Sequence, residues 1–338
     1  MSGLRVAVAG CGPRGIVHGE AAASVDGLEL VGVADTDRAR ADEAGRTLGA
    51  PAHGSGAELV AATEPEIVVV ATPATGRAAL IEELLDGSAL RGLLVEKPLA
   101  LKLGEAEAIV EACERCEVTL AVGHQTRFSV PFARLRETII SGELGEVEFV
   151  RAVGYGNLLD QGNHVIDTLR WLLGDEVAWV MSQAERDLET IGELMPADLE
   201  PWSDPAHPAP MWMTHQLAFE GGTRAAVETG LLYQRSEPFV DDWLQRRVAI
   251  MGSEGFAEAR ISGGFRSLSR SGGERTAPDD FDEPGESTRA LHADLRDAVT
   301  AGRMPASDGR DALRTLAAVL ACLRSADEGR LVRPGASP

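Results

Sequence analysis

Lysine is almost absent from this sequence of 338 residues, since only two of its 32 basic residues are lysines, at positions 97 and 102. Cysteine is also scarce, with four residues, and a secreted protein of this size that depended on disulfides would need more. We therefore expect a reducing, cytoplasmic compartment. Cys113 and Cys116 form a C-x-x-C pair, but no second pair is present to complete a zinc site. We interpret them as ordinary residues of a helix and expect no bound metal.

Long apolar runs and a positive net charge are missing as well. No run approaches the roughly 18 residues that a membrane-spanning helix needs, and the first ten residues have strand character rather than that of a signal peptide. The formal net charge is −21. Such a surface would repel nucleic acid and anionic lipid, so we expect neither as a partner, although local donors could still bind a phosphate-bearing ligand.

The first part of the chain alternates between strand-like and helix-like segments. Its strand-like segments are short and almost wholly apolar, at residues 4–10, 28–35, 66–73, 92–98 and 118–124. Apolar strands separated by helices are typical of a parallel sheet that is buried on both faces. The pattern predicts an α/β, doubly wound Rossmann domain over residues 1–124.

Longer strands follow after about residue 125. We predict them at residues 146–156, 178–186, 211–220, 223–234, 246–252 and 255–261. Gly221-Gly222 is a two-residue hairpin signal, and Ser253-Glu254 is a weaker one. Successive hairpins indicate an antiparallel sheet, so residues 125–338 are predicted to form a second domain of α+β type.

Two polar stretches interrupt this second domain. Residues 195–211 are rich in proline, and residues 270–288 are acidic and rich in turn-forming residues, so both are expected to be loops. Residues 308–326 have a strong helical pattern. The pattern leaves open whether the C-terminal helices pack back on the first domain.

A dinucleotide fingerprint follows the first predicted strand. The hexapeptide GCGPRG places glycine at positions 10, 12 and 15, the G-x-G-x-x-G spacing. These glycines allow a tight turn, close approach of a pyrophosphate and close packing of the next helix. Asp35 ends the second predicted strand, where a carboxylate receives the ribose hydroxyls. A carboxylate there would repel a 2′-phosphate, so we expect NAD rather than NADP, although Arg38 is near enough in sequence to accept such a phosphate.

Lys97 lies at the end of a predicted parallel strand, on the edge where open α/β sheets bind ligands. Arginine stays charged at any workable pH, whereas a partly buried lysine can give up or share a proton. This difference gives a chemical reason for a lysine in an arginine-rich chain. The alternative is a solvated charge, of the kind that Lys102 represents.

A second group of candidate residues lies in the segment 157–174. The spacing predicts a helix over residues 163–173 that ends at Gly174. His164 and Asp167 fall on the face opposite its aliphatic residues, and Asp160 precedes His164 by four positions. These residues could line a pocket, but a solvated His–Asp pair on a surface is also common. The segment by itself favours neither interpretation.

Taken together, these residues suggest a site for alcohol–ketone redox chemistry. His164 is the natural base because imidazole titrates near neutral pH. Lys97 could hold the substrate oxygen and stabilise its developing negative charge, and Asp160 could orient the imidazole.

These segments resemble the Gfo/Idh/MocA family of nicotinamide-dependent oxidoreductases, which includes inositol and glucose–fructose oxidoreductases. The resemblance rests on the order and spacing of several motifs: the glycine fingerprint, Asp35, ATP at 71–73, EKP at 96–98, VGHQTRF at 122–128, SGELGEV at 141–147, and the D-x-x-x-H-x-x-D run of Asp160, His164 and Asp167.

The resemblance implies a Rossmann domain followed by a domain with a large, mostly antiparallel open sheet that supports homodimers or homotetramers. It implies Lys97, Asp160 and His164 as the catalytic group, and a cis peptide bond before Pro98 in many members. It also implies a sugar, cyclitol or similar polyol as the substrate. The expected cofactor-binding residues are Gly10, Cys11, Gly12, Pro13, Arg14, Gly15, Asp35, Thr36, Arg38, Thr72, Pro73, Glu96, Lys97 and Gln125. The expected substrate-binding residues are Lys97, Gln125, Arg127, Asn163, His164 and Asp167.

The sequence departs from the family pattern at one place near the cofactor. Many members have a histidine shortly after the T-P segment, whereas this chain has Gly76-Arg77. Two alternatives to a simple dehydrogenase stay open. One is an enzyme that retains NAD and oxidises a glycoside transiently for elimination or cleavage. The other is a regulator that senses the dinucleotide without turnover.

Overall fold

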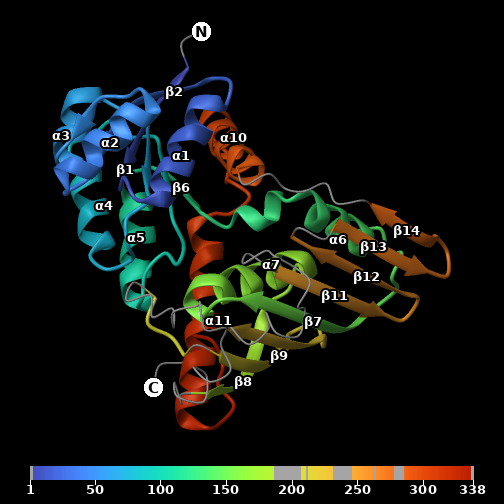
Figure 1. The fold of residues 1–338 in the computed structure, drawn as a ribbon. Helices are drawn as coiled ribbons and strands as arrows, with labels where there is room; N and C mark the ends of the chain where they lie inside the picture. Colours follow the sequence, from blue (N-terminus) through green and yellow to red (C-terminus); the bar gives the residue numbers. More distant parts are fainter. Residues whose placement is uncertain are drawn as a thin grey trace, which may run out of the picture. The chain divides into compact units, whose positions relative to one another are not determined.

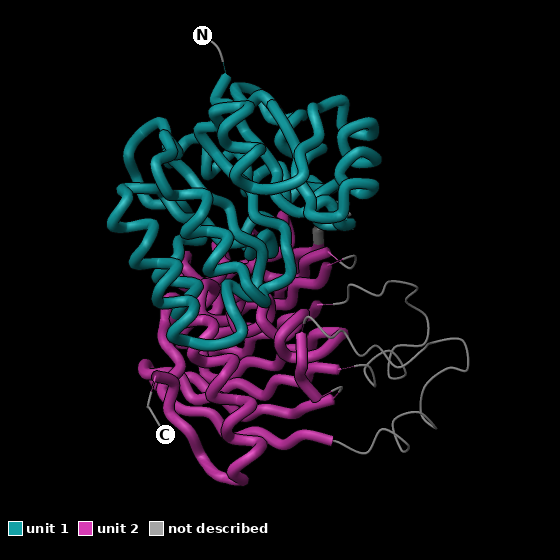
Figure 2. The backbone as a smooth tube through the Cα atoms, turned by 90° about the vertical axis from the view of Figure 1, so that its left-hand side faces the viewer, with its two compact units in different colours: residues 1–128, 283–313 teal, residues 129–282, 314–338 magenta. Residues whose placement is uncertain are grey.

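The computed structural model describes residues 3–185, 207–210, 212–230, 246–261, 264–277 and 285–335. The chain divides into two compact units, coloured teal and magenta in Figure 2. Unit 1 comprises residues 1–128 and 283–313, and unit 2 comprises residues 129–282 and 314–338.

Unit 1 contains a six-stranded sheet in the order β3-β2-β1-β4-β5-β6, and all of its strand pairs are parallel (Figure 1). The strands are β1 (Leu4–Ala9), β2 (Leu28–Ala34), β3 (Ala52–His53), β4 (Ile67–Val70), β5 (Gly92–Val95) and β6 (Thr119–Val122). Every residue of β4 and β5 is buried, as expected for apolar strands with helices on both faces. The sequence therefore predicted this fold class correctly, although it missed the two-residue strand β3.

Two groups of helices cover the sheet of unit 1. Its helices are α1 (Pro13–Ser24), α2 (Arg38–Leu48), α3 (Gly56–Thr63), α4 (Arg77–Leu85), α5 (Leu103–Arg115), the 3₁₀ turn η1 (Gln125–Phe128) and α10 (Glu286–Ala301). Helix α1 packs against α2 and α10, while α4 packs against α3 and α5. Leu291 and Leu295 of α10 join the apolar core beside Val6, Val69 and Leu94, so a segment from late in the chain completes the first sheet.

Unit 2 contains an eight-stranded sheet in the order β14-β13-β12-β11-β7-β10-β9-β8. Its strands are β7 (Val147–Tyr155), β8 (Val177–Glu185), β9 (Trp212–Phe219), β10 (Arg224–Gly230), β11 (Arg246–Gly252), β12 (Gly255–Arg260), β13 (Gly264–Ser269) and β14 (Gly273–Ala277). Among the described strands of this sheet only β7 and β10 pair in parallel, so the sheet is mostly antiparallel, as predicted. The predicted hairpins at Gly221-Gly222 and Ser253-Glu254 join β9 to β10 and β11 to β12.

Helices pack against one face of this sheet in Figure 1. They are α6 (Val130–Ile140), the π-helical turn η2 (Leu158–Gly162), α7 (Asn163–Leu173) and α11 (Gly309–Glu328), whose first residues belong to unit 1. Along β7 the buried residues Val150 and Ala152 flank the exposed Arg151, so one face of the strand is buried and the other is more exposed.

One prediction for unit 2 was wrong. Residues 270–288 were expected to be a loop, but they contain β14, which pairs with β13, and the first residues of α10. Glu274, Arg275 and Thr276 are all exposed on this edge strand. An exposed edge strand has no alternation of apolar residues to reveal it. Residues 195–206, 211 and 231–234, for which a loop and the end of a strand were predicted, lie outside the described residues.

Candidate active site

The glycine loop between β1 and α1 has the shape that a pyrophosphate needs. Gly10 has a φ of 101°, and a Cβ there would lie 2.7 Å from the Ala71 carbonyl carbon. A Cβ on Gly15 would lie 1.9 Å from the Gly10 oxygen, so neither position accepts a side chain. Helix α1 begins at Pro13, and no side chain caps its first turn. Its free N–H groups and the open space above Gly12 therefore fit a phosphate ligand.

Asp35 is held in place at the end of β2. Its Oδ2 accepts a hydrogen bond from the Cys11 N–H at 2.9 Å, and its Oδ1 accepts one from the Asp37 N–H at 2.9 Å. Burial and the neighbouring Asp35 raise the pKa of the Cys11 thiol to about 11, so this thiol is protonated and is no nucleophile. The carboxylate is thus fixed where ribose hydroxyls are expected, and Thr36 follows it in the turn before α2.

Arg38 is not the arginine nearest to Asp35. It forms an ion pair with Asp42 at 3.0 Å, whereas Nη1 of Arg40 lies 3.6 Å from Oδ2 of Asp35. Arg40 is therefore the residue that modifies the charge beside Asp35, and the spacing of the sequence alone did not distinguish the two.

Glu96 lies at the end of β5 and accepts hydrogen bonds from two side chains of α1 and from the backbone of its own loop. Its Oε1 accepts from Nε of Arg14 at 2.7 Å and from Nε2 of His18 at 2.9 Å, and its Oε2 accepts from the Lys97 N–H at 3.0 Å. Burial by itself would raise the pKa of Glu96, but Arg14, His18 and Lys97 hold it well below its usual range. A charged carboxylate therefore joins the glycine loop to the backbone of Lys97.

His18 and His292 extend this network to α10. Nδ1 of His18 lies 2.9 Å from Nε2 of His292, and both rings are buried. Burial lowers the pKa of both imidazoles, so both are neutral. Since Nε2 of His18 must donate to the carboxylate, its Nδ1 accepts a hydrogen bond from the Nε2–H of His292. No sequence pattern indicates this pair, because the two residues are 274 positions apart.

The loops that follow β4 and β5 carry Thr72, Pro73 and Lys97. The Lys97–Pro98 peptide bond is cis, as the resemblance implies. Arg77, at the start of α4, is buried and donates hydrogen bonds to backbone carbonyls of both loops. In the sequence, Gly76-Arg77 marks only a departure from the family pattern, and no neighbouring residue indicates these contacts of Arg77.

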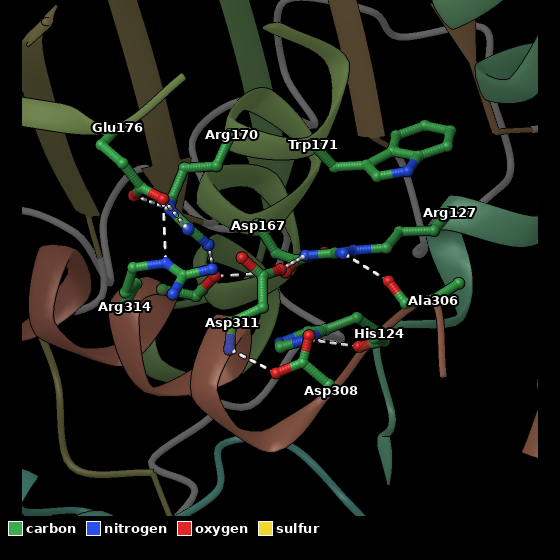
Figure 3. Close-up of polar contacts among 12 residues, drawn as sticks. His124, Arg127, Asp167, Arg170, Trp171, Glu176, Ala306, Asp308, Asp311 and Arg314 are labelled. Atoms are coloured by element: carbon green, nitrogen blue, oxygen red, sulfur yellow. Dashed lines mark hydrogen bonds and ion pairs between the residues drawn. The ribbon is translucent and has the colours of Figure 1, made fainter. Parts of the chain in front are cut away.

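Gln125 and Arg127 lie in η1, directly after β6. The Arg127 guanidinium donates to the Ala306 carbonyl at 2.7 Å and to the Asp311 carboxylate, as Figure 3 shows. Nδ1 of the preceding His124 lies 3.2 Å from the Ser307 hydroxyl. This part of unit 1 is thus tied to the segment that leads into α11.

In unit 2, Asp160 lies on the π-helical turn that precedes α7. The Asn157 side chain caps this turn by accepting the Asp160 N–H at 2.9 Å, and the Asp160 carboxylate accepts from Nε2 of Gln161 at 3.1 Å. Single π-helical turns inside α-helices are frequent at functional sites. Asn157 also donates to the His207 carbonyl at 2.9 Å, which brings the end of the proline-rich stretch against this turn.

Helix α7 has the bounds predicted from the sequence, and Gly174 ends it with a φ of 60°. His164, Asn163 and Asp167 are all buried. Both faces of the helix are buried, so burial does not separate its polar face from its aliphatic one.

Asp167 is held by a network that joins α7 to α11. The Thr315 hydroxyl donates to Oδ1 of Asp167 at 3.1 Å and accepts from Nη1 of Arg170 at 2.7 Å. Figure 3 shows Arg170 turned toward Glu176, with which it forms two hydrogen bonds of 2.8 and 2.9 Å. Arg314 pairs with the same carboxylate at 2.9 Å. Thr315 had no sequence signal, since its partners are more than 140 positions away.

No helix in the described part of the chain is long and apolar enough to cross a membrane.

Two dehydrogenases resemble this chain, one along almost its whole length and the other along about half of it. D-apiose dehydrogenase from Paraburkholderia graminis is 27% identical over 96% of this chain and 88% of its own length. Myo-inositol dehydrogenase Hyg17 from Streptomyces leeuwenhoekii is 33% identical over 53% of this chain, and the match spans only 58% of that protein.

A solved structure shows the same fold. An oxidoreductase from Agrobacterium radiobacter, crystallised with NAD+, L-tartaric acid and magnesium, superimposes with a TM-score of 0.82 over 99% of both chains at 24% identity.

Two family profiles match the two halves of the sequence. Residues 4–124 match the oxidoreductase family with an NAD-binding Rossmann fold, and residues 149–258 match the GFO/IDH/MocA C-terminal domain. With both domains matched in order, the chain belongs to the GFO/IDH/MocA family of NAD-binding oxidoreductases.

Proposed function

We propose that this protein is an NAD-dependent dehydrogenase that interconverts a secondary hydroxyl and a ketone on a sugar, cyclitol or similar polyol. The observation that carries the proposal is the Glu96–Lys97–Pro98 turn at the end of β5. It places the lysine on the ligand-binding edge of the NAD-binding sheet and fixes its backbone through the buried carboxylate. The relatives named as D-apiose and myo-inositol dehydrogenases support this substrate class.

Oxidation of a carbinol requires loss of a hydride and loss of the hydroxyl proton. Bound NAD supplies the hydride acceptor. We propose that His164 accepts the hydroxyl proton, because imidazole titrates near neutral pH. Lys97 would donate a hydrogen bond to the substrate oxygen and stabilise its negative charge, and Asp160 would orient the imidazole and stabilise its protonated form.

Other side chains would bind the substrate hydroxyls and the cofactor. The residues proposed for the substrate are Gln125, Arg127, Asn163 and Asp167. The proposed cofactor residues are the glycine loop, Asp35, Thr36, Thr72, Pro73, Glu96 and Gln125. We propose NAD over NADP because the Asp35 carboxylate, fixed by two backbone N–H groups, would repel a 2′-phosphate.

The open face of the sheet in unit 2 is proposed as a homodimer or homotetramer interface. Met181 and Leu268, on β8 and β13, are large apolar residues exposed on strands of this sheet. Light scattering coupled to size exclusion tests this proposal, and a monomer at micromolar concentration contradicts it.

The activity is tested with purified protein, NAD and a panel of sugars and cyclitols, by following NADH absorbance. We expect turnover of at least one polyol and a loss of about 10²-fold or more in kcat for Lys97→Ala. Lys102→Ala is the matched control, because Lys102 is exposed and pairs only weakly with Glu105, at 3.4 Å. Absence of NADH with every compound, together with unchanged ligand binding by Lys97→Ala, would refute the proposal. Product without net NADH from protein that retains NAD would instead support the transient-oxidation alternative.

A further inference from the structure

Arg77 is a buried cation in an unfavourable place. It is the first residue of α4, and only 2% of its surface is exposed. Helix N-termini carry partial positive charge, and burying a guanidinium costs free energy unless it is well paired. Burial lowers the pKa of Arg77 to about 10, so the group still carries its charge near neutral pH. Specific contacts must therefore offset this cost.

The contacts of Arg77 join two loops. Nη1 donates to the carbonyl oxygens of Glu96 and Pro98, both at 2.5 Å. Nη2 donates to the Thr72 carbonyl oxygen. Thr72 follows β4, and Glu96 and Pro98 flank Lys97 after β5. One planar guanidinium thus links the backbone carbonyls of the loops that follow β4 and β5.

The geometry requires a guanidinium rather than any cation. Arginine presents its two terminal nitrogens in a fixed plane, whereas a lysine ammonium is one point charge on a flexible stem. A lysine at position 77 could satisfy one loop but would leave carbonyls of the other loop buried without a donor. The negative charge of Glu96 also favours the cation at this position.

We propose that Arg77 is a positioning residue that fixes Lys97 and the Thr72–Pro73 cofactor loop relative to each other. The inference rests on the proposed function, because it assigns importance to the place of Lys97. It also gives a role to the chain's departure from the histidine that many family members carry near this position. The guanidinium binds the carbonyls of the residues on both sides of Lys97, and the Glu96 carboxylate binds the Lys97 N–H. These contacts fix the position of the Lys97 backbone, from which its side chain extends.

The test compares Arg77→Lys and Arg77→Ala with Arg91→Lys in the full-length protein. Arg91 is a suitable control because it also belongs to unit 1 and bonds to Glu66 and to the Val299 carbonyl, but its side chain is 45% exposed. Calorimetry gives the Kd for NAD, steady-state kinetics give kcat and KM for a polyol that the wild type oxidises, and thermal melting reports folding. The Arg77→Ala protein is also titrated with guanidinium chloride at millimolar concentrations.

For folded Arg77→Lys we expect a kcat lower by about 10²-fold and an NAD Kd higher by about 10-fold, because misplaced groups lose their orientation. The KM for the polyol should change by less than about threefold, and Arg91→Lys should match the wild type. Guanidinium should partly restore NAD affinity and kcat to Arg77→Ala but not affect the control. A purely structural role would lower the melting temperature without these changes.

Three results would overturn the inference. One is a folded Arg77 variant with wild-type NAD affinity and kcat, and another is an equal effect of the Arg91 control. The third is failure of both Arg77 variants to fold even with guanidinium present, which would make Arg77 a general stabiliser of unit 1. If the wild type oxidises no polyol, the proposed function fails, but the NAD Kd and its rescue by guanidinium still decide the role of Arg77.

Discussion

Three buried polar networks, one in unit 1 and two in unit 2, have different groups at their centres. In unit 1 a single carboxylate, Glu96, accepts from Arg14, His18 and the Lys97 backbone, all within or beside the loops that follow β1 and β5. In unit 2 the hydroxyl of Thr315 bridges Asp167 and Arg170, and a separate histidine, His215, bonds only to hydroxyls. The network in unit 1 thus centres on one buried carboxylate, whereas the two in unit 2 centre on a hydroxyl and on a neutral imidazole.

This difference predicts that a substitution at Glu96 has a larger effect than one at His215 or Thr315. Glu96→Gln removes the charge but keeps the shape, so Arg14 and His18 lose their anionic acceptor. We expect a loss of about 3 kcal/mol in the free energy of unfolding, the low end for a broken buried pair, because the Arg14 side chain is 40% exposed and can turn to water. Urea denaturation measures this loss.

The control for Glu96→Gln is Glu66→Gln, which breaks the more exposed pair with Arg91. Surface pairs contribute about 0–1 kcal/mol, so the control should stay within that range. Equal losses for both variants would show that Glu96 does not organise unit 1 as described.

His215 makes unit 2 sensitive to acid. It is buried between Ser182 and Thr229, and burial lowers its pKa from 6.5 to about 3. In the unfolded chain the imidazole gains a proton below about pH 6.5, so stability from the neutral ring is complete above that pH and is lost as the pH falls toward 3. The loss can reach about 1.4 kcal/mol per pH unit.

We therefore expect His215→Gln to lose less stability than the wild type between pH 6.5 and pH 5, a difference of about 2 kcal/mol. Urea denaturation of both proteins at pH 7.5, 6.5, 5.5 and 5 gives the two slopes. Parallel slopes for the two proteins would mean that His215 takes up its proton in the folded state as readily as in the unfolded chain.

Thr315→Val tests the hydroxyl-centred network of unit 2. Valine keeps the shape but leaves Asp167 and Arg170 without the bridging hydroxyl, at a cost of about 1.5 kcal/mol. Thr138→Val is the control, because Thr138 bonds only to the Arg134 carbonyl within its own helix. If Asp167 binds substrate hydroxyls, KM for the polyol should also rise in Thr315→Val and not in Thr138→Val. An unchanged KM would leave Thr315 a purely structural role.

The sequence could predict features whose residues are near one another in the chain, but not contacts between distant residues. The glycine loop, Asp35, Lys97 and the bounds of α7 each follow from residues that are near one another in the chain, and these features of the structure agree with the pattern. His292 and Thr315 could not be found, since each acts on a residue that only the folded chain brings near. Strand β14 was missed because it is exposed and polar, so burial left no imprint on its sequence.

The smallest expected effect concerns cofactor choice. Arg40 lies 3.6 Å from the Asp35 carboxylate and partly neutralises it, but the side chain of Arg40 is 53% exposed, so solvent screens the interaction. Arg40→Ala should raise the preference for NAD over NADP by about two- to fivefold, which corresponds to the range of exposed ion pairs. Equilibrium binding of both dinucleotides measures the ratio of the two Kd values. Arg38→Ala is the matched control, because Arg38 pairs with Asp42 instead, and its ratio should stay at the wild-type value. A shift in the ratio for Arg38→Ala alone would show that Arg38, and not Arg40, partly neutralises the Asp35 carboxylate. This is the arginine that the sequence suggested.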